Sequence, residues 1–370
     1  MRPLRGHMHP GAPAGGLHGF ERGSLRFIFL AFGEGNDLSR LVQLGHGDGG
    51  ALTRELISRI FEPHLGNPLL GRQEDAALFS LPGGKVALAT DSFIVDPLFF
   101  PGGDIGKLAV CGTVNDLAVM GARPLYLTAG FIIEEGLPME ELERVAVSMA
   151  RAAAEAGVEI VAADTKVTER GAADRLFINT TGIGLREEHL RLGAEMVRPG
   201  DSVIVSGPVG NHGMVILASR MGISPGNGLL SDCACLWPLI REIIKDLPVR
   251  FMRDATRGGL ATVLRELAAA CRMDIIVEEE KIPLCREAAE LSEMLGVDPL
   301  YLACEGRFIA VVPPGAAPGL VERLNRFEQG RGAAVIGRLQ EGGGRALLRT
   351  RFGGTRALDF LRGQHIPRIC

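Results

Sequence analysis

The chain has 370 residues, enough for about two domains, and its 46% hydrophobic and 23% charged residues are typical of a soluble globular protein. Its 40 basic and 44 acidic residues give a formal net charge of −4, so no overall positive field would attract nucleic acid or an anionic membrane. Aromatic residues make up only 5% of the chain, which further disfavours a nucleic-acid partner whose bases stack on aromatic rings.

Neither a membrane span nor a disulfide framework is indicated. No apolar stretch approaches the roughly 18 residues that a spanning helix needs. The seven cysteines are an odd number without a C-x-x-C pair, which fits a reducing cytoplasm and argues against a structural zinc site. Cys233 and Cys235, the closest pair, are interpreted as surface thiols.

In chain order, the first 40 residues mix Gly, Pro, His and Arg without periodicity, and we interpret them as a disordered or extraneous extension. Beyond residue 41, apolar spacing predicts a first helix that Pro63 ends and a strongly amphipathic helix that ends at Gly157. The elements expected in this half are helices at 51–61, 106–120 and 139–156, and strands at 76–81, 85–90, 125–133, 158–163 and 176–184.

A turn at 198–201 is the clearest domain boundary, because a new strand follows it. The elements expected beyond it are strands at 202–206, 274–277, 307–312 and 333–339, and helices from 213 and at 236–245, 258–271, 286–296 and 317–329. From Gly342 the chain is rich in Gly and Arg and has little to bury. Mixed strands and helices in both halves predict domains of the α/β or α+β class.

Aspartates recur at the ends of apolar segments, at Asp75, Asp91, Asp116, Asp164 and Asp254. Each of them alone is explained as well by a helix cap or a turn. Together, carboxylates at strand ends are what a site needs to hold Mg²⁺ ions that bridge to phosphate oxygens. Because carboxylates repel one another, the metal and a polyphosphate would have to arrive together.

Two segments that precede helices could bind the phosphates. They are Gly47, Gly49 and Gly50 before the first helix, and Thr256, Gly258 and Gly259 at the start of a later one. Helix N-termini reached through glycine are common anion sites, although each pattern is weak by itself. The sequence contains neither a P-loop nor a strand-linked G-x-G-x-x-G fingerprint, so a nucleotide would bind by another route.

The last residue, Cys370, follows a Gly-rich run that would let its thiol swing into a distant pocket. The adjoining terminal carboxylate disfavours the thiolate, so this cysteine would need a cationic or hydrogen-bonding host to become nucleophilic. On composition alone, an incidental terminal residue explains it at least as well.

Taken in order, these segments resemble the HypE family of hydrogenase maturation factors, within the superfamily of aminoimidazole ribonucleotide synthetase (PurM-like). The motifs that carry the resemblance are His-Gly-Asp-Gly-Gly at 46–50, Ala-Thr-Asp-Ser-Phe-Ile-Val at 89–95, the segment 97–124, Asp-Thr-Lys-Val at 164–167, the segments 207–213 and 253–260, Glu-Gly-Arg at 305–307 and Pro-Arg-Ile-Cys at 367–370. The resemblance covers about residues 41–370, and other members of the superfamily lack the Pro-Arg-Ile-Cys ending.

The resemblance implies a two-domain α/β fold of the PurM-like type. It assigns residues 41–195 to an N-terminal domain, 199–345 to a C-terminal domain and 346–370 to a mobile tail. In such proteins the N-terminal domains of two chains form a dimeric β-barrel, with ATP bound in a cleft at the interface. The tail would then have an inward position for dehydration and an outward position for carbamoyl loading and cyanide delivery.

The implied activity is a carbamoyl dehydration. A HypE protein accepts a carbamoyl group from HypF onto its C-terminal thiol and uses ATP to dehydrate it to a thiocyanate. The cyanide passes to iron on the HypC–HypD complex and becomes a ligand of the [NiFe]-hydrogenase. By resemblance, Cys370 is the acceptor and the five aspartates hold Mg-ATP. The nucleotide would contact Gly47, Gly49, Gly50, Lys107, Asn115, Thr256, Gly258 and Gly259.

Lys166 and Glu305 match positions near the modified cysteine of the family. Our hypothesis is that Glu305 takes a nitrogen proton while Lys166 stabilises the activated oxygen, with His212 as a third catalytic candidate. A surface ion pair or a capped turn is the alternative for each. The chain departs from the family at Cys304, where asparagine is usual, and a changed tail docking or a stray disulfide could follow. It also departs at Ala163, where glycine is commoner.

Two other functions stay open. A different enzyme of the superfamily, such as a small-molecule kinase, would keep the aspartates but have no use for Cys370. A non-catalytic scaffold would bind the maturation partners and merely retain the nucleotide site.

Overall fold

The computed structural model describes residues 41–47, 51–68, 85–223, 228–360 and 369–370. Several expectations from the sequence lie outside these residues. They are the extension at 1–40, the strand at 76–81, and the site residues Gly49, Gly50 and Asp75.

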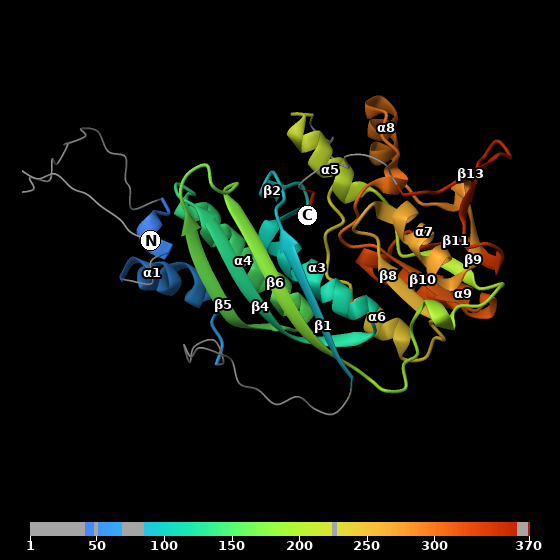
Figure 1. The fold of residues 1–370 in the computed structure, drawn as a ribbon, viewed down its shortest axis with the longest axis horizontal. Coiled ribbons are helices and arrows are strands. Elements are labelled where there is room, and N and C mark those ends of the chain that lie inside the picture. Colours follow the sequence, from blue (N-terminus) through green and yellow to red (C-terminus); the bar gives the residue numbers. More distant parts are fainter. Residues whose placement is uncertain (1–40, 48–50, 69–84, 224–227, 361–368) are drawn as a thin grey trace, which may run out of the picture. The chain divides into compact units, whose positions relative to one another are not determined.

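The N-terminal half is built on a four-stranded sheet in the order β1-β6-β4-β5 (Figure 1). The bounds are β1 Lys85–Phe93, β4 Ala122–Glu134, β5 Glu159–Thr168 and β6 Leu176–Arg186, with the short strands β2 Phe99–Phe100 and β3 Gly103–Asp104 beside them. β4 is parallel to β5 and antiparallel to β6, which is antiparallel to β1. Within the described residues this sheet is open and forms no closed barrel; the expected barrel requires the N-terminal domains of two chains.

Two helices, α3 (Ile105–Val119) and α4 (Met139–Ala156), cover one face of this sheet (Figure 1). Asp104 caps the N-terminus of α3, where its carboxylate accepts the backbone N–H groups of Gly106 (2.8 Å) and Lys107 (3.1 Å). The sequence prediction for α4 is confirmed at both ends. α4 ends at Gly157, which has φ +70° and so takes the left-handed conformation that glycine tolerates best.

A helical segment at 51–65 precedes the sheet and consists of α1 (Ala51–Leu56), a π-helical turn (Ile57–Phe61) and α2 (Glu62–Leu65). The prediction that Pro63 ends this helix is wrong. Pro63 lies in the first turn of α2, where the missing N–H of proline removes no helical hydrogen bond.

The second face of the N-terminal sheet exposes apolar side chains. On β1, Val86 is 57% exposed and Leu88 is 69% exposed, and Ile132 on β4 is 43% exposed. Because successive residues of a strand point to opposite faces, these side chains share their face with Ser92, while Asp91 points toward α3. We call this exposed side the outer face of the sheet.

The C-terminal half is built on a seven-stranded sheet in the order β13-β12-β9-β11-β7-β10-β8. Its strands are β7 Ser202–Val205, β8 Phe251–Asp254, β9 Met273–Glu278, β10 Phe308–Val312, β11 Ala334–Glu341, β12 Ala346–Arg349 and β13 Thr355–Ala357. Its helices are α5 Asn211–Arg220, α6 Trp237–Ile244, α7 Gly259–Cys271, α8 Arg286–Leu295 and α9 Ala317–Leu324. β12 pairs in parallel with β9, and β13 pairs with β12. Residues 346–357, which were expected in the tail, therefore belong to this sheet.

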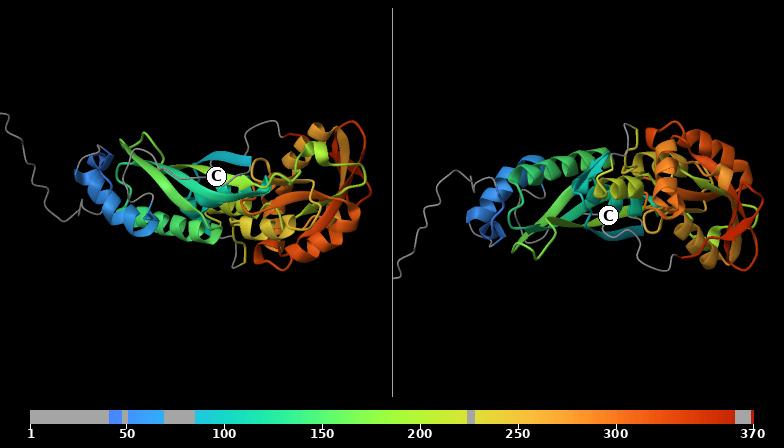
Figure 2. Two further views of the ribbon diagram at one scale, coloured as in Figure 1. Left: turned by 90° about the horizontal axis from the view of Figure 1, so that it is seen from below. Right: turned by 90° about the horizontal axis from the view of Figure 1, so that it is seen from above.

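The two halves share one hydrophobic core, which joins residues of α3 and α4 to residues of α6 and β10. Ile369 and Cys370 at the end of the chain pack against this core. In the views of Figures 1 and 2 the C-terminus accordingly lies where the two halves meet. Among the residues that the structure describes, none of the helices is both long and apolar enough to cross a membrane.

Candidate active site

The last two residues are held by hydrogen bonds from both halves. The backbone N–H of Ile94, which follows β1, donates to a backbone oxygen of Cys370 (3.3 Å). From the other half, Nε2 of His212 in the first turn of α5 lies 2.7 Å from the carbonyl oxygen of Ile369. The thiol of Cys370 is therefore presented to the interior between the halves.

Glu305, just before β10, faces this thiol. It is only 2% exposed, and its Oε1 has no hydrogen-bond partner among the described residues. Burial raises the pKa of Glu305 well above its usual value, and the nearby Cys233, Asp254, Asp232 and Asp91 raise it further. Burial likewise raises the pKa of Cys370, followed by the charges of Glu305 and Asp91 and a hydrogen bond to Glu305. The docked tail thus places a neutral thiol beside a carboxyl group that also holds its proton more tightly than usual.

Three of the predicted metal ligands gather beside this pair, on three different elements. Asp91 on β1 accepts a hydrogen bond from Thr113 Oγ1 on α3 (3.3 Å). Asp116 lies one turn further along α3, and burial followed by the charges of Asp254 and Asp91 raises its pKa to about 7. Burial also raises the pKa of Asp254 at the end of β8.

These carboxylates fit a cation that arrives with its ligand. In the described part of the chain, no three His, Cys, Asp or Glu side chains form a ready metal cage. Yet Asp91 and Asp254 lie close enough to Asp116 for their charges to raise its pKa. Oxygen ligands of this kind suit Mg²⁺, which is commonly held by one or two carboxylates together with phosphate oxygens.

Asp164 and Lys166 lie elsewhere. Their ion pair (2.9 Å) is on β5, with side chains 72% and 64% exposed. Asp164 pairs with Gly130 on β4, which pairs with Asn179 on β6, so both β5 side chains belong to the outer face. The hydrogen bond from Lys166 lowers the pKa of Asp164. Within one chain, these two residues do not meet Cys370.

The predicted nucleotide contacts are mostly engaged by the protein itself. Asn115 on α3 is 1% exposed; it donates to the carbonyls of Ala234 (3.0 Å) and Glu305 (3.2 Å) and accepts from the N–H of Leu236 (2.8 Å). It therefore fastens the loop at 229–236, which we call the cysteine loop, to the segment that carries Glu305. Lys107 Nζ donates to the carbonyl of Gly102 (3.2 Å).

The glycines at the start of α7 also meet protein atoms. Gly258 and Gly259 have φ of +67° and +63°, and a Cβ on Gly259 would lie 2.5 Å from the carbonyl oxygen of Leu302. Thr256 hydrogen-bonds Asp254 and lowers the pKa of that aspartate. Gly47 ends the 3-10 turn Leu44–Gly47, away from these residues in sequence.

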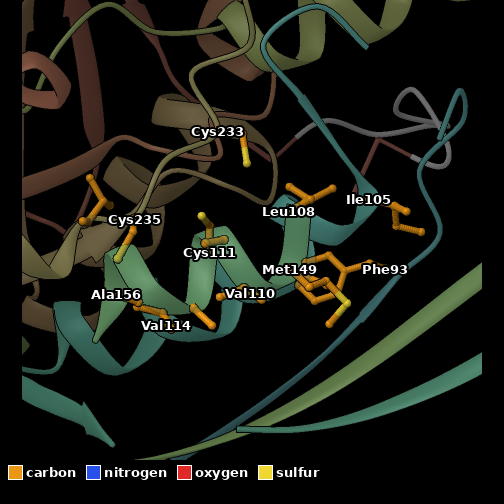
Figure 3. Packing of buried hydrophobic residues seen from close by; sticks show 14 of the residues in the cluster. Phe93, Ile105, Leu108, Val110, Cys111, Val114, Met149, Ala156, Cys233 and Cys235 are labelled. Carbon is orange, nitrogen blue, oxygen red and sulfur yellow. The ribbon is translucent and has the colours of Figure 1, made fainter. Parts of the chain in front are cut away.

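The interpretation of Cys233 and Cys235 as surface thiols is wrong. They are 2% and 5% exposed, and Cys233 faces Cys111 of α3 (Figure 3). The cysteine loop packs onto apolar α3, which the spacing of two thiols could not reveal. Cys304 is a buried free thiol, so no stray disulfide forms, and its Sγ accepts the N–H of Gly210 (3.1 Å).

Sequence reasoning missed Ser231 and Asp232 of the cysteine loop. Asp232 is 7% exposed and accepts the backbone N–H groups of His212 (2.9 Å) and Gly306 (3.2 Å). It thereby ties His212 to the neighbour of Glu305. The local sequence signal is an aspartate within the run of small residues at 231–235, and this signal is weak.

Known families match both halves of the chain. The family model "AIR synthase related protein, N-terminal domain" matches residues 73–186, and its C-terminal counterpart matches residues 198–348. "Carbamoyl dehydratase HypE" of Azotobacter vinelandii is 45% identical over 331 residues, or 89% of this chain and 97% of the relative.

Solved structures agree over a similar length. A HypE crystallised in complex with ATP has a TM-score of 0.86 at 44% identity, with 89% of this chain and 99% of that chain covered. A HypE–HypF complex has a TM-score of 0.72 at 43% identity and covers 84% of this chain and 99% of the matched chain. The similarity therefore spans both sheets and nearly the whole of each relative.

Proposed function

The chain belongs to the HypE family of carbamoyl dehydratases, and we propose that it performs its ATP-dependent dehydration in hydrogenase maturation on the sulfur of Cys370. The observation that carries this assignment is the docked tail. The thiol of the last residue lies against the buried carboxyl of Glu305, which itself lies near two of the predicted metal ligands, Asp91 and Asp254. A substrate tethered to the chain end would be held in this way beside an acid–base group and a phosphate site.

The chemistry requires an activated oxygen. A carboxamide oxygen is a poor leaving group, so a carbamoyl group on sulfur does not simply lose water. Transfer of the γ-phosphoryl group of ATP to this oxygen converts it into phosphate. Loss of that phosphate and of both nitrogen protons leaves a thiocyanate, so R–S–C(O)NH₂ and ATP yield R–S–C≡N, ADP, hydrogen phosphate and one proton.

Glu305 is placed to take a nitrogen proton. It contacts the sulfur that bears the carbamoyl group, and its free Oε1 offers a lone pair. Burial raises the pKa of this carboxyl well above its usual value, so its ionised form is a stronger base than an exposed carboxylate. The same burial keeps the docked Cys370 thiol protonated, which makes it a poor nucleophile. Loading therefore takes place with the tail outward.

Three aspartates would form the part of the site that binds the phosphates of ATP. Asp91, Asp116 and Asp254 would hold Mg²⁺ against the phosphates of ATP, where the ion neutralises charge on the transferred phosphoryl group. Arg257 lowers the pKa of both Asp116 and Asp254 and adds a cation on the same side. The chain itself thus contributes the carboxylate ligands and an arginine.

A second copy of the chain would complete the site. Lys166 and Asp164 lie on the outer face, where Val86 and Leu88 also expose apolar surface that water disfavours. If two copies pack these faces together, their open sheets close into the barrel of a homodimer and Lys166 leaves the solvent. Lys166 would then stabilise the activated oxygen in the site of the partner subunit.

The proposed partners follow from the reaction. A HypF-like carbamoyltransferase loads Cys370, as the solved HypE–HypF complex supports, and the HypC–HypD complex accepts the cyanide. All seven cysteines are free thiols, which suits the cytoplasm. ATP and Mg²⁺ are the expected cofactors.

Mass spectrometry of the C-terminal peptide tests the proposal. After incubation with HypF, carbamoyl phosphate and Mg-ATP, we expect a carbamoyl adduct on Cys370 that then loses water, and no adduct on Cys370→Ser. An adduct that never dehydrates would indicate a scaffold. ATP turnover on small phosphate acceptors that survives removal of residues 369–370 would indicate a small-molecule kinase.

A further inference from the structure

The ring of His212 lies at the centre of a buried hydrogen-bond network that ends on the tail. His212 is fully buried, and its Nδ1 lies 2.8 Å from Ser231 Oγ while its Nε2 lies 2.7 Å from the carbonyl oxygen of Ile369. Its backbone N–H donates to Asp232 (2.9 Å). The ring also meets Phe100 edge-on, with centroids 5.3 Å apart. Contacts on several sides therefore fix the orientation of the imidazole.

The partners determine which nitrogen carries the proton. A carbonyl oxygen only accepts, so Nε2 must donate to Ile369. In the neutral ring Nδ1 then accepts, and the hydroxyl of Ser231 donates to it. The oxygen of Ser231 in turn accepts the N–H of Cys233 (3.1 Å). Burial lowers the pKa of His212, which favours this neutral form.

Both ring nitrogens are thus committed, one to the tail and one to the cysteine loop. Neither is available to take a proton from a group on the sulfur of Cys370. His212 therefore does not serve as the third catalytic group that the sequence suggested. Its only described contact with the tail is the backbone carbonyl of Ile369, which is present whatever group Cys370 carries.

We propose that His212 is a positioning residue, whose neutral imidazole latches the Ile369 carbonyl and so sets the fraction of tails docked beside Glu305. The expected effect on the dehydration rate rests on the proposed function. The hydrogen bond that forms the latch requires neither ATP nor a partner protein. Loss of one hydrogen bond changes an equilibrium by about two- to tenfold, and a buried carbonyl left without a partner adds to the effect.

Alkylation of Cys370 measures the latch directly. The docked thiol is half-buried and its raised pKa keeps it protonated, so iodoacetamide reacts mainly through the undocked tail and the rate follows the population of that state. In the full chain at pH 7, we expect His212→Leu to accelerate alkylation of the C-terminal peptide about tenfold. His212→Gln, whose amide can donate to the same carbonyl, should restore most of the protection. The control His189→Leu removes an exposed histidine and should leave the rate unchanged.

A second measurement distinguishes an effect of His212 on docking of the tail from a direct effect on the dehydration step. On chain already carbamoylated at Cys370, His212→Leu should slow dehydration in proportion to the lost docking, with the KM for ATP unchanged and loading by HypF undiminished. Should the leucine variant unfold, Ser231→Ala carries the same test, because it removes the hydroxyl that orients the ring. Unchanged alkylation in folded His212→Leu or Ser231→Ala would overturn the latch. A failure of Cys370 to accept a carbamoyl group would overturn the proposed function and leave the alkylation result standing.

Discussion

The buried carboxyl of Glu305 is the residue on which the proposed proton transfer depends. Glu305→Gln keeps the shape and the burial of the side chain but cannot accept a proton. Positioned bases contribute about 100- to 10,000-fold to such steps, and we expect the single-turnover rate of dehydration to fall within that range. Loading of Cys370 should persist, because we propose that it takes place on the outward tail.

The exposed Glu293→Gln on α8 is the matched control for this substitution and should retain the full rate. Quenched-flow mass spectrometry of the C-terminal peptide resolves the two steps. Dehydration at an undiminished rate in Glu305→Gln would assign the proton transfer to another group.

The free energy of unfolding should depend on pH through the carboxyl group of Asp116. Burial and the charges of Asp254 and Asp91 raise its pKa to about 7, against about 3.9 in an unfolded chain. Because the folded value is the higher one, its contribution is complete below pH ~4 and is lost as the pH rises to about 7. We expect the metal-free protein to lose roughly 2–4 kcal/mol of unfolding free energy over this range through Asp116.

Asp116→Asn should remove this loss and weaken Mg-ATP binding at the same time. Denaturant unfolding in EDTA at pH 5 and pH 8, compared between the two proteins, isolates the contribution of Asp116 from that of other groups. An equal difference in both proteins would mean that the carboxyl is already ionised in the folded state at pH 5.

At the scale of elements, the cysteine loop and the segment before β10 touch at Gly306. A Cβ there would lie 1.9 Å from the carbonyl oxygen of Asp232, so Gly306→Ala must push the two segments apart. We expect a loss of about 1–3 kcal/mol in unfolding free energy and faster alkylation of Cys370. Gly315→Ala, where nothing lies within 4 Å, is the control and should be neutral or slightly stabilising in thermal unfolding. Equal melting temperatures of Gly306→Ala and the unsubstituted chain would show that the two segments move apart without loss of stability.

Elements with strong local signals could be predicted from the sequence. α4 has three- and four-residue apolar spacing and a glycine cap, and its predicted bounds agree with the structure. β12 could not be found in this way, because it depends on pairing with β9, about 70 residues away in sequence, and β13 in turn pairs with β12. Helix periodicity is local, whereas strand pairing depends on the whole sheet.

In the candidate site, too, local motifs could be predicted from the sequence, whereas contacts that depend on tertiary packing could not. The motifs identified Cys370, Glu305 and the inner aspartates, whose proximity the structure supports. They placed Lys166 in the same site, but strand alternation puts it on the opposite face of the sheet. They suggested catalysis for His212 because a histidine in a motif does not reveal its partners. Those partners, Ser231 and Ile369, are distant in sequence and come together only through tertiary packing.

At the scale of the whole molecule, one chain holds only part of the proposed site. Asp91, Asp116 and Asp254 lie on the inner side with Cys370, whereas Lys166 is 64% exposed on the outer face. The apolar outer face, which includes Leu88 at 69% exposure, gives a second copy a reason to bind there. Leu88→Glu should therefore produce a monomer in light scattering. Met294→Glu, which alters a side chain on α8 that is 62% exposed, should not.

Mixed dimers decide whether Lys166 acts in the site of the partner subunit. Lys166→Met and Glu305→Gln should each be inactive alone. In a mixed dimer, however, the wild-type Lys166 of one chain would meet the wild-type Glu305 of the other. Random pairing on co-expression makes about half of the dimers mixed, each with one intact site, so about a quarter of the wild-type dehydration rate should return. If Lys166 serves its own chain, every site keeps one defect and no activity returns. Adding Leu88→Glu to both chains should abolish the recovery, because without the interface no lysine can reach the partner.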